Sequence, residues 1–533
     1  MHDADRPTPI RIALFTLVLV AGLFFRVYTL ADKLVWHDEV ATRVLSAGNT
    51  SDDWKAAIYT GKVVDVSEVL QFQHDNPKRS VAGGIRDLAE HDPQHPPLYY
   101  VLARLWVRCV GDGVATLRML SVFFSVLSFP AMYWLALELS ASRRVAWAAV
   151  MFSAVSPFFV LYAQEAREYA LWGLLTMLST AALLRAIRES RQESTARRRL
   201  WSVWGVYTVC IALGLYTSFT TASVIFVHVL YIVLLERARV TRVSVQCAAA
   251  LAASGVLFLP WAINMLRQFD AFRASMAWSK VIVIPRSVLL RILSLNVSRT
   301  VLDLWPEVDQ VTLLAIVVDG LAAALVVAAL VYVARRTPRE TSLLVLTLVL
   351  LPIAMLLVPD LAYGGIRSIS GRYMLPAWIG VELALAMFLA SQKSDSAWRW
   401  VGGAAVLAIG MVSDVSNSRR VAPWTKSVSV LLPDVARAIN AAPAPLVVGN
   451  AERHHPGNLL ALVDILKPGT RMQLLPIGSE EAWVTPPNAG DVFLYSPTDQ
   501  FRAQLEAREH VHTRLVMKDI FTELWKVERD GVQ

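Results

Sequence analysis

Two adjacent carboxylates, Asp38 and Glu39, stand just beyond an apolar run that covers residues 10–31. A run of that length is long enough to cross a bilayer as a helix, so the two acids are expected at a membrane–water boundary. Trp36 favours the same interface, where aromatic side chains are enriched. A carboxylate held in partly apolar surroundings is suited to take a proton from a hydroxyl or an amine as a general base. The alternative is a solvated acidic end to a helix.

A second group of polar side chains lies further along the chain. His95 precedes two prolines, which stiffen the backbone and fix the direction of the side chain. It is predicted to contact a substrate phosphate or to orient an acid, the alternative being an exposed loop histidine. Glu165 and Glu168 are spaced to share a helical face, with Arg167 between them. Three charges between two apolar runs are costly unless they pair or line a wet cavity, and both possibilities stay open.

Arginine side chains suited to phosphate lie next to two apolar runs. Arg372 and Tyr373 open a late run, and Arg26 lies near the end of the first. Either arginine is a plain interfacial anchor or a phosphate ligand, for which the planar guanidinium fork is well shaped. The outer-loop histidine and aspartate have no third ligand at a recognisable spacing, so no metal is expected.

The composition places the chain in the membrane class. Of its 533 residues 55% are hydrophobic and 18% charged, and the mean hydropathy is +0.46. The net charge of +8 is concentrated in short connections between apolar runs, which indicates membrane orientation and no nucleic-acid partner. The three cysteines are scattered and predict neither a disulfide framework nor a metal site.

Eleven segments have the length and hydropathy of membrane-spanning helices. They cover approximately residues 10–31, 115–139, 145–163, 169–187, 201–217, 219–235, 245–265, 311–334, 342–358, 373–391 and 398–413. A twelfth apolar segment, residues 96–110, is short and is interrupted by Arg104 and Arg108. It is predicted to lie on the membrane surface as an amphipathic helix.

The distribution of charge sets the predicted orientation. With the N-terminus inside, the five inner loops hold sixteen Lys and Arg against five acids. The outer loop over residues 32–94 holds eleven acids against seven bases. This is the positive-inside pattern, although the outer loop over residues 266–310 leans basic. All the candidate site residues, and the tail after Asp414, are then predicted on the outer face.

The sequence of the tail predicts a small α/β domain. Strands are predicted over residues 444–449, 472–476, 491–495 and 513–516, and helices over 457–467 and 498–508. Alternation of strand and helix favours a partly parallel sheet. The predicted division is a membrane domain over residues 1–413, whose outer loop with juxtamembrane helices covers 32–110, and an extracytoplasmic domain over 414–533. The tail has no glycine-rich phosphate loop, so no nucleotide is expected there.

Taken together, the motifs resemble those of a bacterial family-39-type glycosyltransferase, a group similar to protein O-mannosyltransferases and to the aminoarabinose transferase that modifies lipid A. The motifs are Trp36 to Glu39, His95 to Tyr100, Gln164 to Ala170 and Arg372 to Pro376. The resemblance covers roughly residues 10–392 and says nothing about the tail. It implies a polytopic α-helical membrane protein with the GT-C fold and about eleven transmembrane helices, in the bacterial inner membrane.

The resemblance also implies a reaction. The donor would be a sugar on a polyprenyl phosphate, displaced with inversion at its anomeric carbon, and no metal or other cofactor would be needed. Asp38 matches the family's catalytic aspartate and Glu39 the second acid of that pair. Either Glu165 or Glu168 would be the second-loop acid. His95 would contact the donor or the acceptor, and Arg372 the phosphate.

Lipid A or its core, a protein and a polysaccharide all remain possible acceptors. Two other classes of protein have similar hydropathy. A transporter or flippase of a lipid-linked glycan would also have many spans, but its charges are expected near the midplane of repeated halves. A non-catalytic assembly scaffold would use the tail as its binding module.

Overall fold

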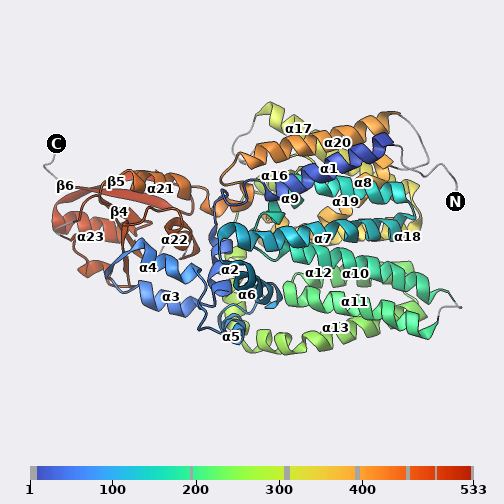
Figure 1. Ribbon diagram of the computed structural model, residues 1–533, viewed down its shortest axis with the longest axis horizontal. Helices are drawn as coiled ribbons and strands as arrows, with labels where there is room; N and C mark the ends of the chain where they lie inside the picture. The colour runs from blue at the N-terminus through green and yellow to red at the C-terminus, as the bar shows by residue number, and fades with distance from the viewer. Residues whose placement is uncertain are drawn as a thin grey trace. The chain divides into compact units, whose positions relative to one another are not determined.

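The computed structural model describes residues 9–192, 196–304, 312–390, 397–451, 456–486 and 489–529. The chain forms two compact units (Figure 1). The helical unit comprises Met1–Leu30, Leu88–Tyr99 and Arg118–Arg419, and the sheet unit comprises Ala31–Asp87, Tyr100–Leu117 and Arg420–Gln533. Segments far apart in the sequence therefore share each unit, and each unit is described by itself below.

Long apolar helices dominate the helical unit. Within the described ranges, eight segments are long and apolar enough to cross a membrane. They are α7 (Val114–Ser140), α10 (Tyr169–Ser190), α11 (Arg197–Thr217), α13 (Arg242–Arg267), α17 (Leu313–Arg336), α18 (Arg339–Tyr363), Gly371–Ala390 with α19 (Leu375–Ala390), and α20 (Ala397–Ser418). They coincide with eight of the eleven predicted spans.

The three other predicted spans are shorter or broken. Two are the apolar helices α1 (Pro9–Val27) and α12 (Thr221–Leu235). The third, predicted as one helix over residues 145–163, is the pair α8 (Arg143–Ala154) and α9 (Pro157–Ala163), bent by 60°. Pro157 causes the break, because it removes a backbone donor and disfavours the helical conformation of Ser156. The predicted class, a polytopic helical membrane protein, is confirmed.

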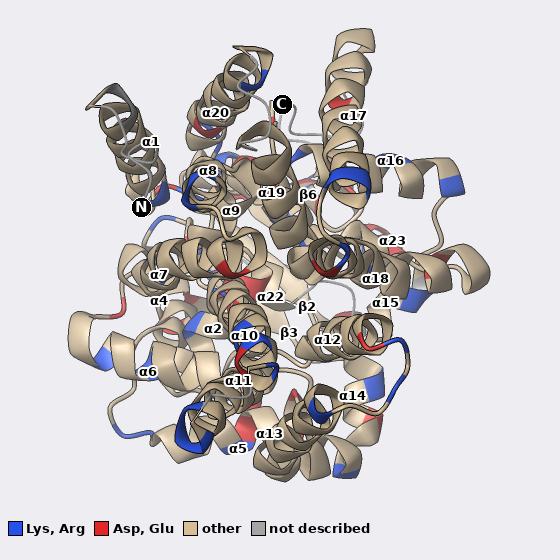
Figure 2. Cartoon of the chain, turned by 90° about the vertical axis from the view of Figure 1, so that its right-hand side faces the viewer, with Lys and Arg blue, Asp and Glu red and all other residues tan. Residues whose placement is uncertain are grey.

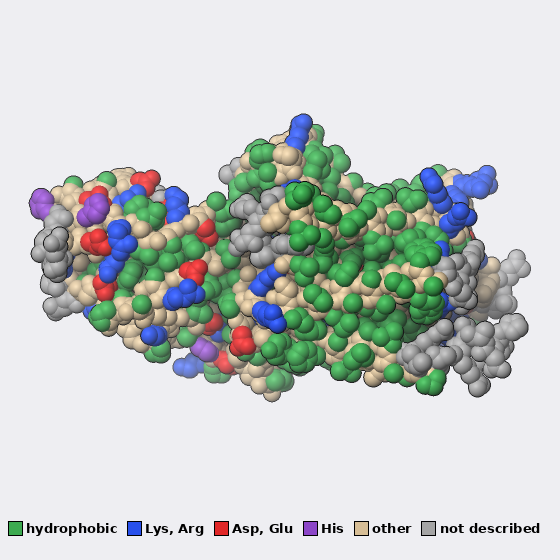
Figure 3. All heavy atoms as spheres, turned by 90° about the horizontal axis from the view of Figure 1, so that it is seen from above, with side chains coloured by type: hydrophobic (Ala, Val, Ile, Leu, Met, Phe, Trp, Pro, Cys, Tyr) green, Lys and Arg blue, Asp and Glu red, His purple; other side chains and the backbone are tan. Residues whose placement is uncertain are grey.

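The connections predicted to share one side of the membrane meet at one end of the helical unit. Arg191 pairs with Glu236 at 3.0 Å and with Glu340 at 2.6 Å. Arg188 pairs with Glu138 at 3.0 Å. Figure 2 shows the bundle end-on, with Lys and Arg at helix ends, and Figure 3 shows a largely hydrophobic flank with basic side chains at one end. Apolar flanks and a charged end are what a membrane-crossing bundle requires.

Four further helices accompany the spans. They are α14 (Phe269–Ser275), α15 (Trp278–Val281), α16 (Arg286–Ser298) and α5 (Val81–His91). Two 3₁₀ turns, η3 (Arg367–Ile369) and η4 (Gly371–Met374), lead into α19.

A six-stranded mixed sheet forms the centre of the sheet unit. Its strand order is β1-β3-β2-β4-β6-β5. The strands are β1 (Val63–Asp65), β2 (Leu446–Asn450), β3 (Arg471–Leu475), β4 (Val492–Tyr495), β5 (Val511–Lys518) and β6 (Glu523–Arg529). Strand β2 is parallel to β3 and β4, as the alternating pattern predicted, and every residue of β2 is buried. Covering helices are α21 (Leu432–Asn440), α22 (Pro456–Val463) and α23 (Asp499–Glu509).

The structure groups the outer loop with the tail, which differs from the predicted division at residue 413. Helices α2 (His37–Ala47), α3 (Ser51–Ile58) and α4 (Val66–Leu70) lie in the sheet unit, and β1 pairs antiparallel with β3. One hydrophobic core contains Val40, Val44 and Trp54 of the loop together with Leu432 and Leu459 of the tail. Each segment alone would leave its apolar face exposed, so the two fold as one body.

The helix predicted on the membrane surface is α6 (Leu98–Val110), which is too short to be a candidate span. Its two arginines bind loop residues within the sheet unit. Arg104 is buried and donates to the carbonyl oxygens of Ser46 and Asn76, both at 2.7 Å, and to the Asp75 carboxylate. Arg108 donates to the Arg79 carbonyl at 2.7 Å.

Candidate active site

The connection between α9 and α10 carries the first cluster of candidate residues. Five residues, 164–168, join the two helices, and all five are buried. Gln164 donates through its side-chain nitrogen to the carbonyl oxygens of Phe25 at 2.7 Å and Tyr28 at 2.9 Å. The connection is thereby fixed to the end of α1. Its charged side chains consequently have defined positions.

A continuous polar chain links the loop before α6 to this connection. Nδ1 of His95 lies 2.8 Å from Oδ2 of Asp92. Its Nε2 lies 3.2 Å from Nη2 of Arg167. Nε of Arg167 in turn lies 3.1 Å from the Glu168 carboxylate. The structure therefore brings His95 together with Arg167 and Glu168, which the sequence analysis selected from a separate segment.

The charges in this chain shift one another's protonation. Burial acts to lower the pKa of His95, but the charge and hydrogen bond of Asp92 outweigh it, so the pKa is raised. Burial acts to raise the pKa of Asp92, but the charge and hydrogen bond of His95, with help from Arg167, hold that pKa below its usual value. The two groups thus stabilise each other's charged forms.

Helix α13 holds the segment that carries His95. Nε1 of Trp261 donates to the Pro93 carbonyl at 3.1 Å, and the side-chain nitrogen of Asn264 donates to the Ala89 carbonyl at 2.8 Å. These bonds satisfy backbone acceptors that a loop in a partly apolar setting would otherwise leave unpaired. His95 is consequently directed rather than free, as its position before two prolines predicted.

Arg372 and Tyr373 lie in η4, directly before α19. The guanidinium carbon of Arg372 is 5.8 Å from the ring centre of Tyr169 and 5.2 Å from that of Tyr373, within cation–π range. The residue is half-buried. The guanidinium carbon of Arg167 lies 5.9 Å from the centre of the same Tyr169 ring. Acids, arginines and tyrosines from three connections therefore gather at one place.

The two candidate acids of the α9–α10 connection differ in their surroundings. The Glu168 carboxylate is paired with Arg167 next to it. Glu165, three positions earlier in the same connection, is also buried. Both acids therefore remain candidates for the second-loop acid.

Arg26 has a structural position that the sequence did not anticipate. It is fully buried, and Nε donates to Ser125 Oγ at 2.9 Å. Its two terminal nitrogens donate to the carbonyl oxygens of Gly22 at 2.9 Å, Ala154 at 2.5 Å and Ser153 at 3.0 Å. The last two carbonyls lie at the end of α8, where the break before α9 removes their helical donors. All three nitrogens are thus engaged by protein, which does not suit a phosphate ligand.

Asp38 and Glu39 lie in the sheet unit, in the first turn of α2, where acids favour the helix dipole. The structure separates the pair. Glu39 is 1% exposed, and its carboxylate is 2.6 Å from Nζ of Lys426. The side chain of Asp38 is 21% exposed, and its carboxylate lies 3.1 Å from Nε2 of His37. Asp38 is consequently the more accessible acid of the pair, and Glu39 is enclosed.

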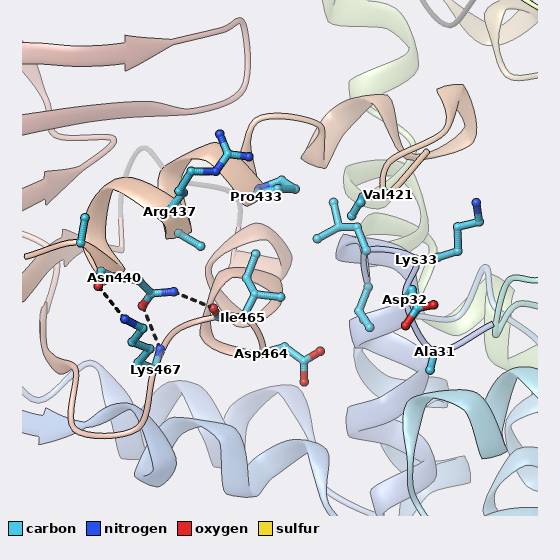
Figure 4. Close-up of a pocket in the computed structure, with 14 residues that line it drawn as sticks. Ala31, Asp32, Lys33, Val421, Pro433, Arg437, Asn440, Asp464, Ile465 and Lys467 are labelled. Atoms are coloured by element: carbon cyan, nitrogen blue, oxygen red, sulfur yellow. Dashed lines mark hydrogen bonds between the residues drawn. The ribbon is translucent and has the colours of Figure 1, made fainter. Parts of the chain in front are cut away.

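A cavity of about 700 Å³ also lies in the sheet unit (Figure 4). Leu34, Val35 and Ile465 give it an apolar part, and Lys33 and Lys467 are among its charged residues. Figure 4 shows Lys467 hydrogen-bonded to Asn440, beside helix α21. A lining that mixes apolar and polar groups is typical of small-molecule sites. Neither Asp38 nor Glu39 is among its lining residues.

Sequence reasoning missed two residues that complete these clusters. Asp92 stands three positions before His95, a spacing that could have suggested the pair. Lys426 had no such signal, because it is separated from Glu39 by 387 positions. Within the described ranges, no group of three or more His, Cys, Asp or Glu side chains could hold a metal ion.

One protein-family model matches part of the chain. Residues 94–263, which include His95 and the α9–α10 connection, match the family model described as dolichyl-phosphate-mannose-protein mannosyltransferase. A search of curated proteins gave no match.

Solved structures show where the fold recurs. ArnT from Cupriavidus metallidurans bound to undecaprenyl phosphate is similar with a TM-score of 0.54 and 10% identity, over 98% of each chain. Its apo form gives the same TM-score at 12% identity, over 97% of each chain. The oligosaccharyltransferase AglB from Archaeoglobus fulgidus, in complex with an inhibitory peptide and a dolichol-phosphate, gives 0.50 at 12% identity, over 87% of this chain and 65% of AglB. At these identities the likeness establishes the fold.

Proposed function

We propose that the chain is a family-39-like membrane glycosyltransferase of the GT-C fold, and that it transfers a sugar from a polyprenyl-phosphate donor to an acceptor at the outer face of a bacterial inner membrane. The observation that carries the proposal is that Arg167, which contacts His95, and Arg372 both lie within cation–π range of the Tyr169 ring. In ArnT, a protein of the same fold, the bound ligand is undecaprenyl phosphate. A polyprenyl-phosphate donor is the corresponding substrate for this chain.

Arg372 is proposed to bind the donor phosphate. The residue is half-buried, and its guanidinium lies near the rings of Tyr169 and Tyr373, which help to hold it in place. A fixed, partly desolvated positive charge stabilises the charge that develops on a leaving phosphate without having to reorganise. Tyr373 supports the guanidinium from one side.

Asp38 is proposed as the general base. It accepts the proton of the acceptor's hydroxyl or amine as that atom bonds to the anomeric carbon, and the bond from this carbon to the phosphate oxygen breaks. The phosphate leaves with the bonding electron pair, and the configuration at the carbon is inverted. Partial exposure suits Asp38 to this role, whereas the enclosed Glu39 suits a supporting one.

Glu165 is proposed as the second acid of the site, with Glu168, which is paired with Arg167, as the alternative. His95 is 30% exposed in its side chain and is directed by Asp92. It is therefore proposed to contact the sugar or the acceptor, and Arg167 contacts its Nε2. We further propose that the N-terminus is cytoplasmic and that the sheet unit, with the cavity of Figure 4, presents the acceptor.

The proposal is tested with membranes that contain the protein and a radiolabelled polyprenyl-phosphate sugar. Label that moves to lipid A, to protein or to polysaccharide supports a transferase, and the labelled product names the acceptor class. Label that crosses sealed vesicles without changing carrier supports the alternative, a transporter or flippase. If label moves neither to an acceptor nor across the vesicle membrane, both the transferase and the transporter proposals are wrong. Glycolipid profiling of a deletion strain identifies the missing product independently.

A further inference from the structure

The segment that carries the proposed base is bound along its length by the start of the tail. The backbone nitrogen of Leu34 donates to the Val421 carbonyl at 2.9 Å. Nζ of Lys33 donates to the Arg420 carbonyl at 2.8 Å. Nζ of Lys426, in the 3₁₀ turn η5 (Trp424–Ser429), donates back to the Leu34 carbonyl at 2.6 Å. All these residues belong to the sheet unit.

The strongest of these links is the ion pair between Lys426 and Glu39. The Nζ–Oε2 distance is 2.6 Å, and the two side chains are 2% and 1% exposed. Two charges removed from water to this degree are tolerated only when they are paired and hydrogen-bonded. Lys426 meets both conditions, because it contacts the carboxylate and a backbone carbonyl at once. The first turn of α2 therefore depends on a residue of the tail for its position.

Two elements of the tail contact the same turn of α2. The backbone nitrogen of His37 lies 3.4 Å from Ser429 Oγ, and that hydroxyl donates to the Asn458 side chain at 2.6 Å. Gly457, at the start of α22, lies so close to His37 that a Cβ on it would be 2.8 Å from the Cβ of His37. Only glycine fits such an approach. The start of α2 is thus held by η5 and α22 together.

We infer that Lys426 is a positioning residue for Asp38, and that the tail is an integral part of the catalytic apparatus rather than an accessory module. The inference rests on the proposed function, in which Asp38 is the base. Glu39 follows Asp38 directly in the same helical turn, so fixing the Glu39 carboxylate and the Leu34 carbonyl fixes the direction in which Asp38 projects. A misplacement of about 1 Å at a reacting group can cost about 10²-fold in rate.

Transfer kinetics with the full-length protein test the inference. Lys426→Met should lower kcat by roughly 30- to 100-fold, with the donor KM within about threefold of wild type, because the base is displaced while the phosphate site is intact. Lys426→Arg keeps the charge and should retain kcat within about fivefold. Lys526→Met breaks a half-exposed ion pair with Asp491 in the same unit and should leave kcat within about twofold.

A double variant separates positioning from folding. Lys426→Met alone leaves Glu39 buried without its cation, so the yield of folded protein can fall. Glu39→Gln combined with Lys426→Met removes both charges. It should restore the folded amount toward wild type while kcat per folded molecule stays low. Wild-type kcat in this double variant, or in Lys426→Met, overturns the inference alone. Absence of transfer by the wild-type protein overturns the proposed function and the inference with it.

Discussion

Nη2 of Arg167 lies 3.2 Å from Nε2 of His95. Because a guanidinium only donates hydrogen bonds, this contact requires an unprotonated Nε2, and Nδ1 then carries the hydrogen that points to Asp92. Burial and Arg167 act to lower the pKa of His95, while Asp92 acts to raise it and prevails. Protonation of His95 therefore strengthens its contact with Asp92 and weakens its contact with Arg167.

The pH dependence of stability follows from that raised pKa. A charged His95 paired with Asp92 stabilises the fold fully below the unfolded pKa of about 6.5, and the contribution is lost as the pH rises through the raised folded pKa. His95→Gln should therefore lower the unfolding temperature most below about pH 6.5 and least at alkaline pH. Thermal unfolding over a pH series measures the difference. In an Asp92→Asn background, the effect of His95→Gln on the unfolding temperature should no longer depend on pH. If the effect of His95→Gln in the otherwise wild-type protein does not change with pH, the assignment is contradicted.

Replacing the proposed base should affect chemistry and leave the fold intact. Asp38→Asn should reduce transfer by about 10²- to 10⁴-fold, the usual contribution of a general base. The side chain is partly exposed, so the variant should reach the membrane in normal amounts. Transfer of radiolabelled sugar measures the loss, and Asp52→Asn, an exposed acid of the same unit, serves as the control. Near-normal transfer by Asp38→Asn rules out Asp38 as the base.

Arg372 should not be replaceable by lysine. Lysine keeps the charge but loses the planar fork and the contact with the rings of Tyr169 and Tyr373. Arg372→Lys should lower kcat/KM by about 10²-fold, the usual cost of removing one donor that stabilises a developing anion. Free polyprenyl phosphate should also inhibit this variant less strongly. Arg286→Lys, an exposed arginine at the start of α16, should behave as wild type. Equal inhibition of Arg372→Lys and wild type argues for a plain interfacial anchor.

The helical unit was largely predictable because hydropathy and length are local properties. Each predicted span overlaps an apolar helix of the structure, and the loops expected to lie together do so. The break between α8 and α9 was missed although its cause, Pro157, is visible in the sequence. An apolar run gives the length of a span, but it does not show whether a proline inside it is tolerated as a kink or ends the helix.

The sheet unit was harder to predict because its contacts are remote in sequence. Strand β1 has three residues and is defined by pairing with β3 more than 400 positions away. The loop that contains it shares its core with the tail, so neither segment shows a complete domain by itself. The same reason hid the Glu39–Lys426 pair. In contrast, His95 and Arg167 were found because charges beside apolar runs are rare and each demands a partner.

Arg26 should contribute to stability and not to donor binding. Arg26→Met removes four hydrogen bonds and leaves the carbonyls of Ser153 and Ala154 unpaired in a buried place. The free energy of unfolding should fall by roughly 3 kcal/mol or more. Ser125→Ala removes one of these bonds and should cost about 1 kcal/mol. Chemical unfolding measures both, and the donor KM should stay unchanged. If Arg26→Met raised the donor KM and left the stability unchanged, Arg26 would instead be a ligand of the donor phosphate.

The proposed orientation can be tested with a cysteine that the chain already has. Cys109, near the end of α6, is exposed, whereas Cys210 and Cys247 are buried within α11 and α13. One span, α1, precedes Cys109, so a cytoplasmic N-terminus puts this thiol outside the cell. A membrane-impermeant maleimide should therefore label intact spheroplasts at Cys109, and Cys109→Ser should abolish the labelling. Labelling only after the membrane is opened would indicate the reverse orientation, with the basic loops outside, against the positive-inside rule.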